Sequence, residues 1–100
     1  MNLDDEICYC FHISRRKLVN FARRSLPRVP SQMSECGGAG TGCGWCIPFL
    51  KQIFGQEMRS ETVGQLEQLT PLEYACRRAE YVRAGGGTPA PGATPLPNHT

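Results

Sequence analysis

The sequence predicts a small all-α domain followed by a helical extension and a disordered tail. Apolar residues recur at helical spacing in three segments that are bounded by capping residues, proline or glycine. No segment alternates polar and apolar residues as a strand would. The C-terminal end is rich in Gly, Pro and Thr. We therefore expect a domain over residues 5–55, a connector and C-terminal helix over 56–85, and a disordered tail over 86–100.

The first helix is expected over residues 15–25. Ser14 is a good N-cap residue, and Pro27 prevents the helix from continuing. The apolar face of this helix is Leu18, Val19, Ala22 and Leu26. Beyond Pro27, Ser31 is a candidate N-cap for one short helical turn.

The second helix is expected to begin at Pro48 and to end at Gly55. Its core face consists of Phe49, Leu50, Ile53 and Phe54. The preceding segment, "GGAGTG", favours a loop whose backbone can closely approach another group. Cys46 then lies at the N-terminal end of this helix.

The third helix has the clearest signal. Thr70 and Glu73 form a capping box with Pro71 at the first helical position, and Gly85 marks the end. The expected apolar face is Leu72, Ala75, Cys76, Ala79 and Val82. The connector before it offers three packing points, Val63, Leu66 and Leu69.

Six cysteines in 100 residues exceed ordinary usage, and a chain this short often depends on a metal or on disulfides. The acidic start "MNLDDEICYC" has no basic segment followed by an apolar run, so we expect no signal peptide. No window is apolar enough for a membrane helix. We therefore expect a cytoplasmic protein, in which grouped cysteines are metal ligands or redox groups.

The formal net charge is +2, but the positive charge is concentrated in a stretch without acidic residues. Its members are Arg15, Arg16, Lys17, Arg23, Arg24 and Arg28. Two interpretations stay open, a solvated helix face and a functional patch. No aromatic or groove-reading partners for nucleic acid accompany it, so we expect no nucleic-acid binding.

Four of the cysteines form two close pairs. Cys8 and Cys10 make a C-x-C pair, and Cys43 and Cys46 make a C-x-x-C pair 32 residues further on. Free backbone N–H groups and the dipole at a helix start stabilise thiolates. Four thiolates suit one tetrahedral zinc ion or a 2Fe-2S cluster, and spacing alone leaves both open.

The motifs "ICYCFHIS" and "GTGCGWCIPFL", with a helix and a short turn between them, resemble the BFD-like family of small ferredoxin domains associated with bacterioferritin. The resemblance covers about residues 7–54. It implies a helix-turn-helix fold with a 2Fe-2S cluster as cofactor, held by Cys8, Cys10, Cys43 and Cys46. It also implies basic residues near the cluster that bind anions and partners, for which the candidates are Arg15, Arg16, Arg23, Arg24 and Lys51.

The function expected from this resemblance is one-electron transfer by a ferredoxin-like protein that is not itself an enzyme. The expected partner is a bacterioferritin-like iron store, for iron release, or a reductase. We expect a monomer that binds no membrane, with Arg15, Arg16, Arg23 and Arg24 as the docking face. The alternatives are a zinc- or cluster-stabilised protein-binding adaptor and an iron–sulfur assembly or sensing module.

Four further residues near these motifs have less specific roles. Cys36 is expected to be a buried or loop residue, with a ligand-exchange or redox role as the alternative. Cys76 is expected in the core, and His12 at the surface or beside a ligand. Trp45, between two ligands, either excludes water from the cluster or is an ordinary core aromatic.

Overall fold

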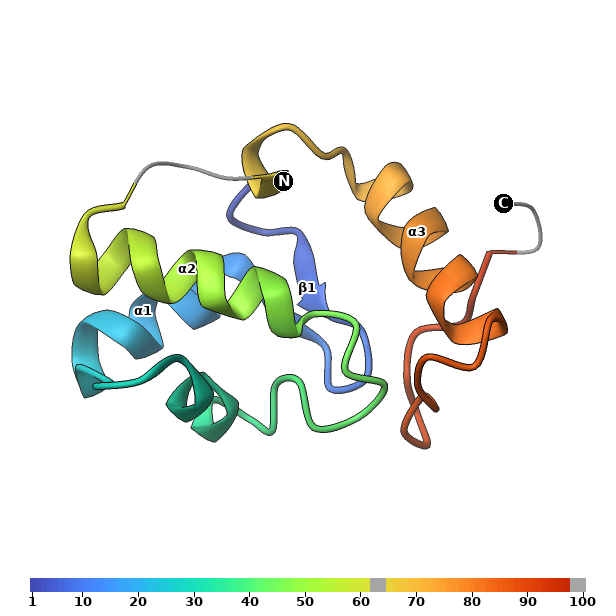
Figure 1. Cartoon of the computed structure of the whole chain (residues 1–100), viewed down its shortest axis with the longest axis horizontal. Helices are drawn as coiled ribbons and strands as arrows, with labels where there is room; N and C mark the ends of the chain where they lie inside the picture. Colours follow the sequence, from blue (N-terminus) through green and yellow to red (C-terminus); the bar gives the residue numbers. More distant parts are fainter. Residues whose placement is uncertain (62–64, 98–100) are drawn as a thin grey trace.

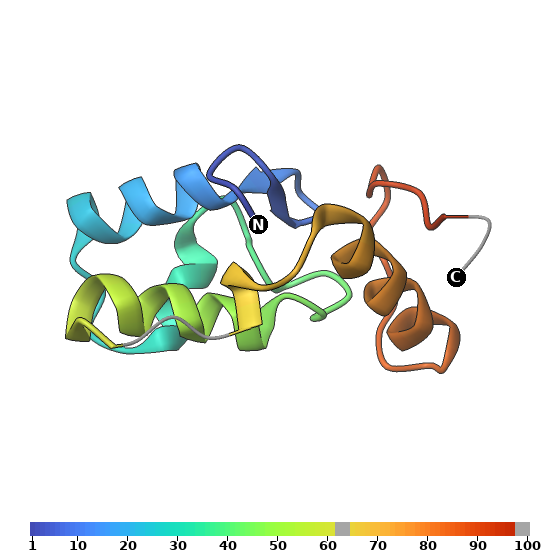
Figure 2. The ribbon, with the colours of Figure 1, turned by 90° about the horizontal axis from the view of Figure 1, so that it is seen from above.

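Two helices pack side by side with loops and a short hairpin at one end, and a third helix packs at that end. The structure is a computed structural model that describes residues 1–61 and 65–97. In Figures 1 and 2, α1 and α2 run side by side in the same direction, and α3 lies at the end where α2 begins. The elements are β1 (Glu6–Cys8), β2 (Ile13–Ser14), α1 (Arg15–Ser25), the 3-10 helix η1 (Pro30–Glu35), α2 (Ile47–Arg59), the 3-10 helix η2 (Gln65–Glu67) and α3 (Pro71–Arg83).

The fold is mostly helical but not strictly all-α, which corrects the sequence-based expectation. β1 and β2 pair in an antiparallel hairpin with an irregular register, in which Glu6 lies opposite Ser14 and Cys8 opposite Ile13. Strands of three and two residues are too short to show alternation in a sequence. The hairpin turn carries Cys10 and requires a left-handed φ of 57° at His12.

The first helix has the predicted bounds, but Leu26, which was expected on its apolar face, is 66% exposed. Ser14 is its N-cap and accepts a hydrogen bond from the Lys17 N–H. The helix ends where Leu26 adopts a left-handed φ of 50°, just before Pro27. The short turn that follows is η1, but it begins at Pro30, so Ser31 is not its N-cap.

The second helix is longer than predicted. It begins at Ile47, runs through Gly55 and ends at Arg59, with Ser60 in the left-handed conformation that closes it. Gly55 does not stop the helix; it makes room for a returning side chain. A Cβ at Gly55 would lie 2.1 Å from the Glu61 carboxylate.

The main core lies between α1, η1 and α2. Its fully buried members include Leu18, Ala22, Met33, Ile53 and Phe54. No helix within residues 1–61 and 65–97 is long and apolar enough to cross a membrane.

The third helix has the predicted capping box, with Thr70 and Glu73 bonded to each other's backbone N–H groups. Its buried face differs from the expected one. Tyr74, Arg78 and Ala79 are buried, whereas Leu72 is 70% exposed and Cys76 is half-buried. Tyr74 and Arg78 therefore pack against the rest of the protein, where the apolar spacing predicted Leu72 and Cys76.

The segment after α3, for which the sequence predicts disorder, contacts the hairpin in this structure. The Thr94 N–H donates to the Tyr9 carbonyl over 2.8 Å, and the His12 ring bonds the Gly92 carbonyl over 2.7 Å. A few specific contacts of this kind are invisible to composition-based reasoning. Residues 98–100 and the expected packing point Val63 lie outside the described residues.

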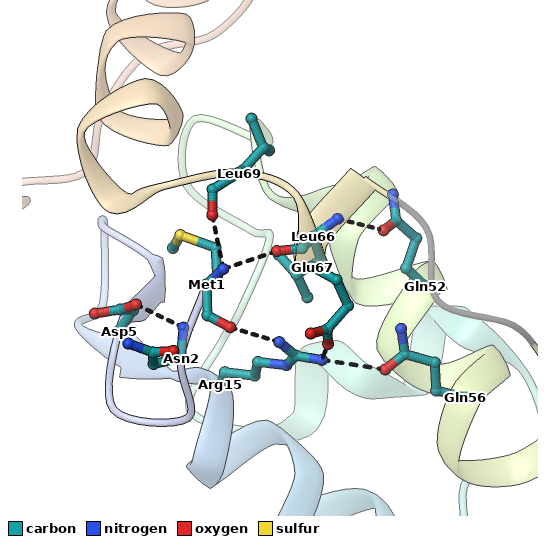
Figure 3. Close-up of polar contacts among 9 residues, drawn as sticks. All are labelled: Met1, Asn2, Asp5, Arg15, Gln52, Gln56, Leu66, Glu67 and Leu69. Carbon is teal, nitrogen blue, oxygen red and sulfur yellow. Dashed lines mark hydrogen bonds and ion pairs between the residues drawn. The ribbon is translucent and has the colours of Figure 1, made fainter.

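A polar cluster joins the start of the chain to the connector (Figure 3). The Met1 amino group donates to the carbonyls of Leu66 and Leu69 over 2.9 and 2.7 Å. Arg15, which is 8% exposed, donates to the Met1 carbonyl over 2.6 Å and to the Glu67 carboxylate. Arg15 thus holds the connector onto α1.

We predict that Arg15→Gln destabilises the protein by about 1–3 kcal/mol, because it leaves buried acceptors without a charged donor. In a protein of this size the melting temperature should fall by several degrees. Arg24→Gln is the matched control, since it removes the same charge from an exposed position of the same helix. Equal melting temperatures for the two variants would contradict this role.

Candidate functional site

Four thiols from two separate loops line one cavity. Cys8 ends β1, Cys10 lies in the hairpin turn, Cys43 lies in the glycine-rich loop, and Cys46 immediately precedes α2. All four are buried, with exposed fractions of 3–7%. The structure therefore brings together all four cysteines that the sequence singled out.

The thiols approach one another in two pairs, each joining the two loops. Cys8 shares a side-chain hydrogen bond with Cys46, and this bond is the main cause of a Cys8 pKa lowered to about 6 and of a raised Cys46 pKa. Cys10 has a corresponding contact with Cys43. The lowered pKa of Cys8 favours its thiolate, which is the form of cysteine that binds metal.

Backbone N–H groups also favour thiolates here. Burial acts to raise the pKa of Cys10, but hydrogen bonds from the Ala90 and Cys43 backbone lower it overall. The Cys43 N–H lies 3.2 Å from the Cys10 sulfur. For Cys8, the backbone groups of Gly40, Phe11 and Cys10 act in the same direction.

Glycine is required where the two loops meet. A Cβ at Gly42 would lie 2.6 Å from the Cys10 sulfur, so any side chain there would push the cysteine loops apart. Gly44, between the later pair of cysteines, has a φ of 79° that other residues rarely adopt. The glycine-rich loop thus lets its backbone lie close to the other cysteine loop, as its composition predicted.

The donor set fits a two-iron cluster. Two pairs of thiols, backbone donors to sulfur and a glycine cradle supply what a four-thiolate cluster requires. Within the described ranges, no three Cys, His, Asp or Glu side chains are grouped as a single metal ion would need.

The other two cysteines lie outside the cavity. Cys36 is buried against α1, with its sulfur 3.9 Å from the Lys17 carbonyl, and burial raises its pKa. Cys76 is half-buried on α3. His12 is largely exposed and bonds Glu6 and Gly92, so it lies beside the C-x-C turn without lining the cavity.

Trp45 lines the cavity and belongs to an aromatic group. Its ring packs against Phe49, Tyr74 and Tyr81 with centroids 5.4 to 5.7 Å apart. Trp45 is therefore a packing aromatic that also lines the cavity.

Sequence reasoning missed Arg78, which also lines the cavity. Its guanidinium lies 3.9 Å from the Cys10 sulfur and 5.2 Å from the centre of the Tyr9 ring. A signal was present, because Tyr74, Arg78 and Tyr81 share one face of a helix at spacings of four and three.

Three of the four arginines expected to form the docking face make contacts within the protein. Arg15 is buried, Arg16 pairs with Asp4 over 2.9 Å, and Arg23 pairs with Glu57 over 2.7 Å. In Figures 1 and 2 the C-terminal end of α1, with Arg23 and Arg24, lies at the opposite end of the molecule from α3. The positive charge of this helix is thus partly neutralised by ion pairs.

A buried cavity that is lined by four thiols, between a hairpin and the start of a helix, is typical of iron–sulfur proteins. The chain belongs to the BFD-like [2Fe-2S] binding domain family, whose model matches residues 6–56. The cofactor of this family is a 2Fe-2S cluster. The matched segment contains all four cavity cysteines and ends within α2.

The chain is also similar to short segments of much longer enzymes. It is 32% identical over 59 residues to nitrite reductase [NAD(P)H] of Emericella nidulans and 33% identical over 57 residues to that of Neurospora crassa, in each case over 57% of this chain. It is 31% identical over 58 residues, 58% of this chain, to the nitrite reductase (NADH) large subunit of Escherichia coli. The match spans only 5–7% of these relatives' lengths. No solved structure matches the chain.

Proposed function

We propose that this protein is a small one-electron carrier whose 2Fe-2S cluster is ligated by Cys8, Cys10, Cys43 and Cys46. The observation that carries the proposal is the meeting of these four buried thiols in one cavity of a chain from a cluster-binding family. When bound, the cluster accepts and releases single electrons. The chain's own residues hold it, exclude water and compensate its charge.

The proposal assigns no catalytic reaction to this chain. The cavity is lined by thiols, glycines, aromatic rings and one guanidinium, and the thiols are all taken up as ligands. Such a site supports electron transfer, which needs a cluster and a docking surface but no positioned acid or base. We place the protein in a reducing compartment such as the cytoplasm.

Two classes of redox partner fit this function. The family resemblance favours a bacterioferritin-like iron store, which would release iron on reduction. The similarity to nitrite reductases that use NAD(P)H favours a larger redox enzyme, because there a related segment lies within the enzyme chain. We propose the redox enzyme as electron donor and leave the iron store as a candidate acceptor.

The ligand assignment predicts that serine at any of the four cavity positions abolishes or bleaches the cluster and lowers the melting temperature. The physical reason is that cluster-binding energy in so small a fold is also folding energy. Iron content, visible absorption and thermal melting measure the effect. Cys36→Ser and Cys76→Ser are matched controls that should keep the colour, since neither thiol lines the cavity. Full colour and stability in one of the four cavity variants would remove that cysteine from the ligand set.

The carrier function predicts that the cluster survives repeated reduction and oxidation. Dithionite followed by cytochrome c as a one-electron acceptor should move about one electron per chain per cycle, with iron content unchanged. An assembly or sensing module would instead lose its cluster to a chelator or to an apo-protein within a few cycles. An adaptor with a structural cluster would fail to reduce cytochrome c.

A further inference from the structure

One face of α3, a helix beyond the family match, contacts both cysteine loops. The Tyr74 hydroxyl donates to the Ile7 carbonyl, next to Cys8, over 2.5 Å. The Tyr81 hydroxyl donates to the Cys43 carbonyl over 3.0 Å. Arg78 lies between them in the helix, and its guanidinium approaches the Cys10 sulfur.

Arg78 is an unusual buried charge. It is 1% exposed, its Nε atom has no hydrogen-bond partner, and within residues 1–61 and 65–97 no carboxylate lies within 4.0 Å of it. The other buried arginine, Arg15, reaches Glu67. A buried cation without a counter-charge is strongly unfavourable. The cavity that Arg78 lines is where a counter-charge would lie.

Two further contacts fix the position of this guanidinium. Its Nη1 atom donates to the Thr94 carbonyl over 3.2 Å, and its plane lies over the Tyr9 ring. Thr94 in turn donates its N–H to the Tyr9 carbonyl. A Cβ at Gly87 would lie 1.8 Å from the Cys43 carbonyl oxygen, so the same segment also passes close to the second loop.

We propose that Arg78 is a positioning and tuning residue of the cluster site, which supplies the positive charge that favours the reduced cluster. A four-thiolate 2Fe-2S cluster carries a charge of about −2 when oxidised and about −3 when reduced. A fixed cation beside one ligand stabilises the more negative state and raises the reduction potential. Residues 71–97 are then part of the redox site, although the family match ends before them. This inference rests on the proposed function.

The test compares reduction potentials of the full-length, cluster-loaded variants Arg78→Gln, Arg78→Lys and Arg77→Gln by spectroelectrochemical titration. Arg77→Gln is the matched control, because it removes the same charge from an exposed neighbouring position of α3. Arg78→Gln should lower the equilibrium constant for reduction about tenfold or more, which is about 59 mV for one electron. Arg77→Gln should shift it much less, since water and salt screen an exposed charge. Arg78→Lys should keep most of the wild-type potential.

Equal shifts for Arg78→Gln and Arg77→Gln, with intact clusters in both, would overturn the proposal. If Arg78→Gln does not load a cluster, Arg78→Met replaces it, because methionine leaves no polar group to bury. If Arg78→Gln and Arg78→Met both lose the cluster and Arg78→Lys keeps it, the result supports the proposal that the positive charge at this position stabilises the cluster. Loss in all three makes Arg78 a purely structural residue. A wild-type protein without a cluster would instead contradict the proposed function itself.

Discussion

Four thiols meet in a buried cavity of a protein of 100 residues, and as cluster ligands they would concentrate negative charge that the rest of the structure must compensate. Thiolates away from water are costly unless donors or cations face them. Backbone N–H groups from the two cysteine loops supply the first compensation. Aromatic rings packed around Trp45 add apolar surface beside the cavity, and an apolar environment makes nearby charges act more strongly.

The two cysteine loops come from distant parts of the sequence and have little regular structure of their own. The hairpin and the start of α2 hold one edge of each loop, and the core between α1 and α2 fixes their spacing. The opposite edge is held by α3, through Tyr74 and Tyr81. The family segment and its extension are therefore packed together through polar and aromatic contacts, which explains how a helix with few buried aliphatic residues packs here.

The features that local chemistry determines were predictable from the sequence. Ser14 and the Thr70–Glu73 pair set helix starts through bonds within a few residues, and the cysteine spacing indicated one shared site. Features that depend on distant partners were not. In the sequence Gly55 resembles a helix end, because the packing of Glu61 against it is visible only in the structure. The hairpin of β1 and β2 is too short to have a periodic pattern.

Arg78 and the segment after α3 show the same limit for the site. An arginine is expected in water, so its burial is apparent only when its neighbours Cys10 and Tyr9 are placed in space. The Gly- and Pro-rich composition after residue 85 resembles a disordered tail, yet Gly92 and Thr94 bond the hairpin turn. The positive run on α1 was visible, but its pairing with Asp4, Glu57 and Glu67 was not.

The central claim is that the four cavity cysteines hold a redox-active 2Fe-2S cluster. Metal and acid-labile sulfide analysis of the purified protein, followed by electron paramagnetic resonance after reduction, tests it most directly. We expect about two iron atoms and about two sulfides per chain, with a spin-½ signal that appears only on reduction. A colourless protein with about one zinc ion per chain and no signal after reduction would contradict the account.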